Sequence, residues 1–142
     1  MFNQSNKKIL AIDFGSKTIG IAISDIDLKF AIPYCEINND AKKFVLLKQI
    51  IDDENINKII LGFPKTENNY VSERHELILN FKNELDQFLK NKYEIVFVDE
   101  SYSTSSAYDS LKAFNVKPSK IKKNKDMIAA SIILEKYLKT LD

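Results

Sequence analysis

The sequence predicts an α/β fold in which a mixed β-sheet is flanked by helices. Near the N-terminus, two apolar segments are separated by only four residues, which is typical of an antiparallel hairpin. Later, two unbroken apolar runs alternate with segments of helical periodicity, which is typical of buried parallel strands. The length of 142 residues suits a single domain spanning residues 1–142.

The strands of this sheet follow from the apolar runs and the residues that bound them. We expect strands at Lys8–Asp13, Thr18–Ser24, Lys58–Phe63 and Glu94–Asp99. Another strand fits within residues 29–37, KFAIPYCEI, where Pro33 limits it to a sheet edge or a bulge. Between the first two strands, Gly15 is expected to supply a backbone conformation that few other residues adopt.

The helices are expected where apolar side chains recur every three to four residues. Four segments show this spacing, at residues 41–53, 72–90, 103–114 and 126–141. The stretch 115–125, NVKPSKIKKNK, carries a proline and five lysines and is predicted to be a loop. His75 is the single histidine, and we expect it to be a surface residue of its helix.

Composition excludes several classes of protein. Hydrophobic residues make up 44% of the chain and charged residues 29%, and no apolar run reaches the ~20 residues of a membrane span. The N-terminus shows no signal peptide, so a cytoplasmic location without membrane association is expected. The single cysteine, Cys35, excludes an internal disulfide and a cysteine zinc site. A net charge of +1 neither requires nor excludes a nucleic-acid partner.

Three acidic residues stand at positions where this fold would bring them together. Asp13 ends the first strand, Glu100 follows the run IVFVD, and Asp126 opens the last helix. If the strands before Asp13 and Glu100 are parallel neighbours, both acids emerge at the same sheet edge, where ligands of such folds bind. Two unit charges ~4 Å apart repel by about 4 kcal/mol at an effective dielectric near 20, so a cation must offset the cluster. Oxygen ligands favour Mg²⁺ or Mn²⁺, as one ion or two.

Each acid also has a purely structural interpretation. Asp13 could start a turn, and Asp126 could simply complement the helix dipole. Glu100 could be a solvated residue at a strand end, with Asp99 as the functional acid instead. Gly15 and Gly20 favour a site, because without side chains they let a metal, a phosphate or a neighbouring strand approach the backbone beside Asp13.

Four motifs resemble a known bacterial family. These are LAIDFGSKTIGIAISD, IILGFP, VFVDESYST and KDMIAASIILEKYL, and they span nearly the whole chain in order. They resemble the pre-16S rRNA nucleases, which are also described as Holliday-junction-resolvase-like proteins with a ribonuclease-H-like fold. The resemblance implies a small cytoplasmic hydrolase of ribosome maturation, with metal-binding catalytic acids at Asp13, Glu100 and Asp126.

The sequence departs from the family pattern at two places. The family commonly has an arginine after the Asp-Glu pair, and this chain has Ser101, which removes a fixed cation near the scissile phosphate. The loop after LGFP usually contains a glycine, and here residues 65–70 contain none.

Candidate nucleic-acid contacts surround the proposed site. Ser103 and Thr104 could bind phosphate oxygens or cap the helix that starts there. Lys17 could face phosphate or be an ordinary turn lysine. The lysine run, with Lys122, Lys123 and Lys125, could steer phosphate or form a solvated face.

Four functions compete at this stage. The first is a metal-dependent nuclease acting on precursor 16S rRNA ends, with structured RNA and the precursor of the small ribosomal subunit as partners. The second is a Holliday-junction-resolving DNA endonuclease, which would act as a symmetric dimer, whereas the first could be a monomer or a homodimer. The third is an actin-like ATPase, which needs a second lobe and a second glycine-rich loop that are missing here. The fourth is a catalytically weak nucleic-acid-binding module, suggested by Ser101.

Overall fold

The computed structural model describes residues 7–65, 70–100, 117, 119 and 123–141. Its elements lie close to the predicted ones. The strands are β1 (Lys8–Phe14), β2 (Thr18–Ser24), β3 (Ala31–Asn38), β4 (Ile56–Phe63) and β5 (Glu94–Asp99). The helices are α1 (Lys43–Asp53), α2 (Glu73–Phe88) and α5 (Lys125–Lys139). The predicted helix at 103–114 lies outside the described residues.

The strands form one mixed sheet in the order β3-β2-β1-β4-β5. The pairs β1–β2 and β2–β3 are antiparallel, and β1–β4 and β4–β5 are parallel. The predicted α/β class with a hairpin followed by parallel strands is therefore confirmed. One assumption was wrong: β1 and β5 are parallel but not neighbours, because β4 lies between them.

β3 has both of the features that Pro33 predicts, a position at the sheet edge and a bulge. β3 is an edge strand, and its register with β2 shifts between Ile21 and Ala22. Cys35 pairs with Ile21 and Pro33 pairs with Ala22, so Tyr34 is the additional residue of a bulge. A proline lacks the N–H that an inner strand would need, so these are the positions where a sheet tolerates it.

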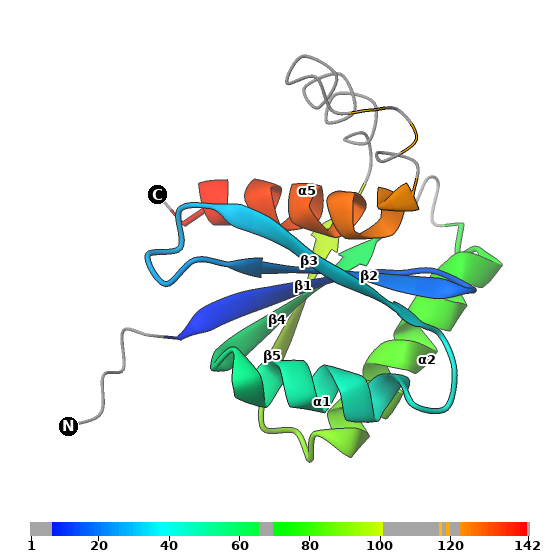
Figure 1. The fold of residues 1–142 in the computed structure, drawn as a ribbon. Coiled ribbons are helices and arrows are strands. Elements are labelled where there is room, and N and C mark those ends of the chain that lie inside the picture. Colours follow the sequence, from blue (N-terminus) through cyan, green and yellow to red (C-terminus); the bar gives the residue numbers. More distant parts are fainter. Residues whose placement is uncertain (1–6, 66–69, 101–116, 118, 120–122, 142) are drawn as a thin grey trace.

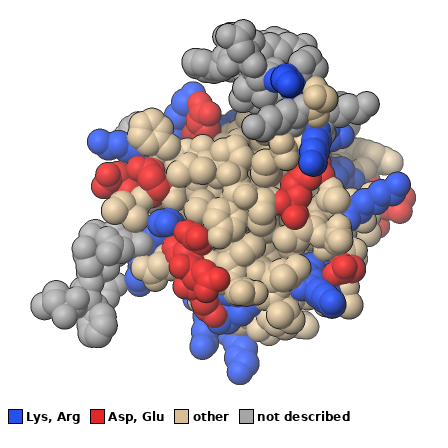
Figure 2. All heavy atoms as spheres, viewed as in Figure 1, with Lys and Arg blue, Asp and Glu red and all other residues tan. Residues whose placement is uncertain are grey.

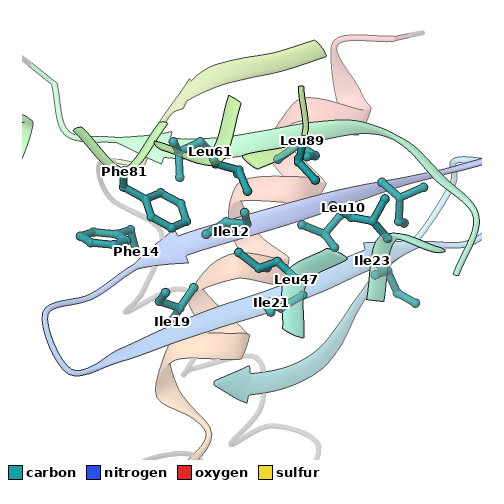
Figure 3. Packing of buried hydrophobic residues seen from close by; sticks show 14 of the residues in the cluster. Leu10, Ile12, Phe14, Ile19, Ile21, Ile23, Leu47, Leu61, Phe81 and Leu89 are labelled. Atoms are coloured by element: carbon teal, nitrogen blue, oxygen red, sulfur yellow. The ribbon is translucent and has the colours of Figure 1, made fainter. Parts of the chain in front are cut away.

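Helices cover both faces of the sheet, with α1 and α2 on one side and α5 on the other (Figure 1). On the α1/α2 side, large side chains from three strands pack against both helices, and the Phe14 ring packs at a tilt against the Phe81 ring with centroids 4.6 Å apart (Figure 3). Both rings are almost fully buried. Among the described residues this cluster is the larger of two apolar cores, and its burial stabilises the fold.

The α5 side is built from smaller side chains. Its cluster includes Ala11, Ala22 and Ala130, together with Ile60 and Leu134. Small residues on both surfaces allow the helix to come close to the strands. The α5 side of the sheet is therefore the side on which backbone and side chains approach one another most closely.

Two predictions of local structure were wrong. Gly15 does not adopt a positive φ. Its missing side chain matters for space instead, because a Cβ there would lie 2.4 Å from the Thr18 carbonyl oxygen. Within the stretch predicted to be a loop, Ser119 and Lys123 are helical and Lys125 already belongs to α5.

Among the helices that the structure describes, none is long and apolar enough to cross a membrane.

Candidate active site

The alternation of side chains along the strands places two of the predicted acids on the α5 side. Ile9 and Ala11 belong to the α5-side core, so Asp13, two residues further, points to the same side. Val96 and Val98 pack against that core as well, and Glu100 continues their alternation just beyond β5. The Glu100 N–H donates to the Phe63 carbonyl oxygen at 3.1 Å, which extends the strand pairing by one residue.

Gly62 allows Glu100 to reach Asp13 across the intervening strand. It lies in β4, one residue beyond Leu61, the partner of Ile12. A Cβ at Gly62 would lie 2.9 Å from Glu100 Oε2 and 2.6 Å from Ile133 Cδ1. The missing side chain therefore provides the space that the Glu100 carboxylate occupies, even though β1 and β5 are not adjacent.

Gly20 has the same effect on the other side of Asp13, which is its partner in the β1–β2 pairing. A Cβ on Gly20 would lie 2.0 Å from the Asp126 carbonyl oxygen and 2.7 Å from the Met127 nitrogen. If residue 20 of the strand carried a side chain, α5 could not dock so closely. Gly20 thus brings the first turn of α5, and Asp126 with it, to the edge where Asp13 lies.

Two polar side chains hold the start of α5 in place. Thr18 donates a hydrogen bond from its hydroxyl to Asp126 Oδ2. Glu36 Oε2 accepts from the backbone N–H groups of Asp126 and Met127, at 2.8 and 3.0 Å. The Glu36 carboxylate therefore caps the helix where the helix dipole is positive. Strand β3 supplies this cap from the sheet edge.

Arg74, in the first turn of α2, lies against both strand-end acids. Its Nη2 is 2.9 Å from Glu100 Oε1 and 3.8 Å from Asp13 Oδ1, and its Nε donates to the same Glu100 oxygen at 3.2 Å. The acid side chains are only 15% and 14% exposed, whereas the arginine side chain is 45% exposed. The guanidinium therefore supplies the positive charge that offsets the repulsion between the two carboxylates.

The environment raises the pKa of Asp13 from 3.8 to about 7. Burial is the largest cause, because it disfavours the charged form. The Glu100 carboxylate comes next, since it repels a charged Asp13 and accepts a hydrogen bond from a protonated one. Arg74 acts in the opposite direction, and Asp126 makes the smallest contribution to the increase.

His75 is buried, so its expected place on the surface was wrong. Its Nδ1 accepts from the Ser72 N–H at 2.9 Å, and its Nε2 donates to the Pro64 carbonyl oxygen at 2.8 Å. In return, the Ser72 hydroxyl accepts from the His75 N–H, which completes a capping box at the start of α2. These bonds fix the turn from which Arg74 extends.

The three predicted acids line one pocket. Its volume is about 260 Å³, and it is lined by Asp13, Arg74, Glu100, Lys125, Asp126, Ala129, Ile132 and Ile133. Asp99 is exposed and lines a different hollow, with Phe63, Pro64, Lys65 and Phe97. Of the two adjacent acids, Glu100 is therefore the one that faces Asp13.

The predicted nucleic-acid contacts are distributed less compactly. Lys125 lines the pocket, whereas Lys17 is exposed in the β1–β2 turn and Lys123 is exposed before α5. Ser103, Thr104 and Lys122 lie outside the described residues, as does Ser101. On the face shown in Figure 2, Lys and Arg side chains alternate with Asp and Glu around an area of uncharged residues.

Four residues that shape the site were not identified from the sequence: Glu36, Gly62, Thr18 and Arg74. Two of them belong to residue types that are rare in this chain, which could have pointed to them. Arg74 is the only arginine among 21 lysines and arginines, and Gly62 is one of only three glycines. All three glycines relieve close contacts, two of them directly beside the predicted acids. Glu36 and Thr18 gave no signal, because their partners are 90 and 108 residues away.

The donor set fits a hard divalent cation, although the side chains do not form a closed coordination shell. Within residues 7–65, 70–100 and 123–141, no three acidic, histidine or cysteine side chains are close enough together to hold an ion as they lie. Asp126 is engaged by Thr18, and Arg74 stands beside the other two acids. The carboxylate oxygens themselves are the ligands that Mg²⁺ and Mn²⁺ prefer.

A mixed sheet in the order β3-β2-β1-β4-β5, flanked by helices, is the fold of the ribonuclease-H-like class, which includes hydrolases of phosphodiester bonds. Residues 7–140 match the family model described as "RuvX: Holliday junction resolvase". The chain belongs to this family of bacterial nucleases.

Relatives from several bacteria share most of the chain. A protein of Malacoplasma penetrans, named as a pre-16S rRNA nuclease, is 64% identical over 134 residues, which cover 94% of each chain. A Staphylococcus saprophyticus protein with the same name is 39% identical, covering 94% of this chain and 96% of its own length. The resemblance to the pre-16S rRNA nucleases is thereby confirmed.

Solved structures support the fold. The fowlpox virus resolvase, solved in complex with its substrate Holliday junction DNA, matches with a TM-score of 0.56 at 16% identity. The match covers 94% of this chain and 98% of that one. A second structure of the fowlpox virus enzyme gives a TM-score of 0.52.

Proposed function

We propose that this nuclease removes the ends of precursor 16S rRNA in a reaction that depends on Mg²⁺ or Mn²⁺. Its catalytic and metal-binding residues would be Asp13, Glu100 and Asp126, and its partner would be the precursor of the small ribosomal subunit in the cytoplasm. The name carried by the Malacoplasma penetrans and Staphylococcus saprophyticus relatives supports the choice of substrate.

One observation carries the catalytic part of the proposal. Acids from β1, from the end of β5 and from the first turn of α5 line one pocket, although 87 residues separate Asp13 from Glu100 and 26 more precede Asp126. Burial and the neighbouring Glu100 carboxylate raise the pKa of Asp13, so the charged form of this acid is disfavoured while no cation is bound. Buried acids with a perturbed pKa that line a common pocket are typical of functional sites, and a metal site needs such a set of oxygen ligands.

Different residues of the site have different roles in this mechanism. Asp13, Glu100 and Asp126 would hold the metal, which when bound supplies an activated water and neutralises the charge that develops on the phosphate. Glu36 and Gly20 fix the position of Asp126 by holding the start of α5. Lys125, at the margin of the pocket, offers a positive charge to the phosphate backbone.

A second candidate is resolution of four-way DNA junctions. The description of the family model and the fold of the fowlpox virus resolvase favour it. The chemistry at the acids would be the same. The difference lies in assembly, because a junction has two-fold symmetry and its cleavage calls for two sites in a symmetric dimer.

A digest with purified protein tests these candidates. Three substrates are incubated with Mn²⁺: an RNA carrying the precursor 16S end, an unstructured single-stranded RNA and a four-way DNA junction. We expect cleavage of the precursor RNA by the wild type and none by Asp13→Asn. Asp27→Asn, which alters an exposed carboxylate in the β2–β3 turn, is the matched control and should cleave normally.

The outcomes separate the candidates. Cleavage of the junction alone by a dimer would replace rRNA processing by junction resolution. Binding of RNA without metal-dependent cleavage would identify a catalytically weak binding module. Equal cleavage by the wild type and Asp13→Asn would refute the site itself.

A further inference from the structure

We propose that Arg74 is a displaceable counterion: it neutralises Asp13 and Glu100 while no divalent ion is bound, and it binds substrate phosphate after the ion replaces it. The inference rests on the proposed metal-dependent function and adds a substrate-binding residue to it. The observation behind it is the position of one guanidinium between two carboxylates of the same pocket.

The guanidinium and a metal ion would compete for the same oxygens. Arg74 Nη2 stands 2.9 Å from Glu100 Oε1 and 3.8 Å from Asp13 Oδ1. A bound Mg²⁺ approaches its oxygen ligands to about 2.0–2.1 Å and carries twice the charge. The two cations are attracted to the same two carboxylates and repel each other at this distance. Binding of the doubly charged ion therefore displaces the singly charged guanidinium from the acids.

The structure provides the displaced side chain with a neighbouring space. Arg74 lines a second hollow of about 250 Å³, together with Phe14, Ser16, Glu73 and Leu77. Its side chain is 45% exposed, so leaving the acids requires little desolvation. Its backbone stays fixed, because the capping box of Ser72 and His75 holds this turn of α2. The guanidinium would thus remain within one side-chain length of the metal-binding acids.

At that distance the released guanidinium fits the chemistry of the substrate. An arginine presents a planar fork of N–H donors that matches two oxygens of a phosphate. Lys125 lines the same pocket as the acids. Arg74 from α2 and Lys125 from α5 would then place positive charge on the backbone of a strand that crosses the pocket.

The test compares Arg74→Gln and Arg74→Lys with the wild type. Lys82→Gln is the matched control, because it removes a positive charge from the same helix at a position where the lysine pairs with Asp86. Affinities for Mn²⁺ and Ca²⁺ are measured by isothermal titration. Affinity for a labelled precursor-end RNA is measured by anisotropy at several salt concentrations, with and without Ca²⁺, and a gel verifies that the RNA is intact.

We expect Arg74→Gln to bind Mn²⁺ about tenfold more tightly, because a competing charge is gone. With Ca²⁺ present, the slope of log affinity against log salt should fall by about 0.7–0.9, the value of one lost phosphate contact. Without a divalent ion the slope should not change, because Arg74 is then engaged by the acids. Arg74→Lys should keep the slope, whereas Lys82→Gln should alter neither quantity.

Two results would overturn the proposal. Unchanged or weaker Mn²⁺ binding by Arg74→Gln would show that the arginine only organises the acids. An unchanged salt slope in Ca²⁺ would show that it does not bind phosphate. Failure of the wild type to bind metal or cleave RNA would instead refute the metal-dependent nuclease, and the role of Arg74 with it.

Discussion

The two faces of the sheet are built for different purposes. The face covered by α1 and α2 carries Leu, Ile and Phe side chains that interlock in a large core. The face covered by α5 carries alanines and glycines, and the helix backbone lies almost on the strand at Gly20. The first face provides stability through apolar burial. The second buries smaller side chains, and the close approach of α5 to the strands that they allow places three acids at one edge.

The largest expected effect on stability is on the α1/α2 face. Phe81→Ala removes a ring that contacts both Phe14 and Phe44, and we expect it to lower the free energy of unfolding by about 3–5 kcal/mol. Urea denaturation followed by circular dichroism measures the loss. The protein that remains folded should still bind Mn²⁺ with wild-type affinity. A large fall in that affinity would mean that the two faces are not independent.

Gly20→Ala tests the opposite face. The new Cβ would collide with the backbone of Asp126, so α5 must shift, at a cost of about 1–3 kcal/mol. We expect this variant to lose RNA cleavage and Mn²⁺ binding while staying folded. Ile21→Val, the next residue on the same strand but facing the larger core, is the control. It should lose about 1 kcal/mol and keep cleavage.

Asp13→Asn should stabilise the protein without metal by about 1–2 kcal/mol at pH 8, while abolishing cleavage. Because the folded pKa of about 7 lies above the ordinary value of 3.8, the folded wild type binds more protons than the unfolded chain between these values. Asp13 therefore costs the wild type no stability below pH 4, where it is protonated in both states, and the cost of ionising it in the folded state grows as the pH rises from 4 to 7.

Thermal unfolding of Asp13→Asn and the wild type at pH 4, 6 and 8 measures this difference. The two melting curves should coincide at pH 4 and separate as the pH increases. A variant that is less stable than the wild type at pH 8 would show that Asp13 serves the fold rather than a site.

The smallest effect is expected for Glu36→Gln. The amide can still accept the two backbone hydrogen bonds, but it loses the charge that favours the helix N-terminus, which costs about 1 kcal/mol or less. Asp25→Asn, which alters a carboxylate that likewise accepts two backbone hydrogen bonds but lies in the β2–β3 turn, is the comparison. Only Glu36→Gln should also weaken Mn²⁺ binding in titrations, because only that cap positions Asp126. Equal Mn²⁺ binding by the two variants would contradict this role of Glu36.

Much of the fold could be read from short-range patterns. Unbroken apolar runs identified the central strands, and the link of four residues identified the hairpin. Pro33 predicted an edge strand or a bulge, because the absence of an N–H is a local property with the same consequence in any sheet. The acids Asp13 and Glu100 could be placed at strand ends by the same reasoning.

Other features depended on which strands became neighbours. From the sequence, the strands of Asp13 and Glu100 were assumed to be adjacent. In the structure β4 lies between them, and the missing side chain of Gly62 leaves the space that Glu100 occupies. His75 was expected at the surface, because nothing near it in the chain indicates that the Pro64 carbonyl would be its partner. Arg74 was passed over for the same reason, since its two partners lie 61 and 26 residues away.

The sequence by itself determined the elements, the mixed character of the sheet and the identity of the acids at its edge. Periodicity, glycine and proline act within a few residues, so these features need no knowledge of the rest of the chain. Only the tertiary structure decided that Arg74 stands between two of the acids and that Glu36 caps the helix of the third. Those contacts join residues far apart in sequence, and they exist because folding brings the strand ends and the first turns of two helices to one place.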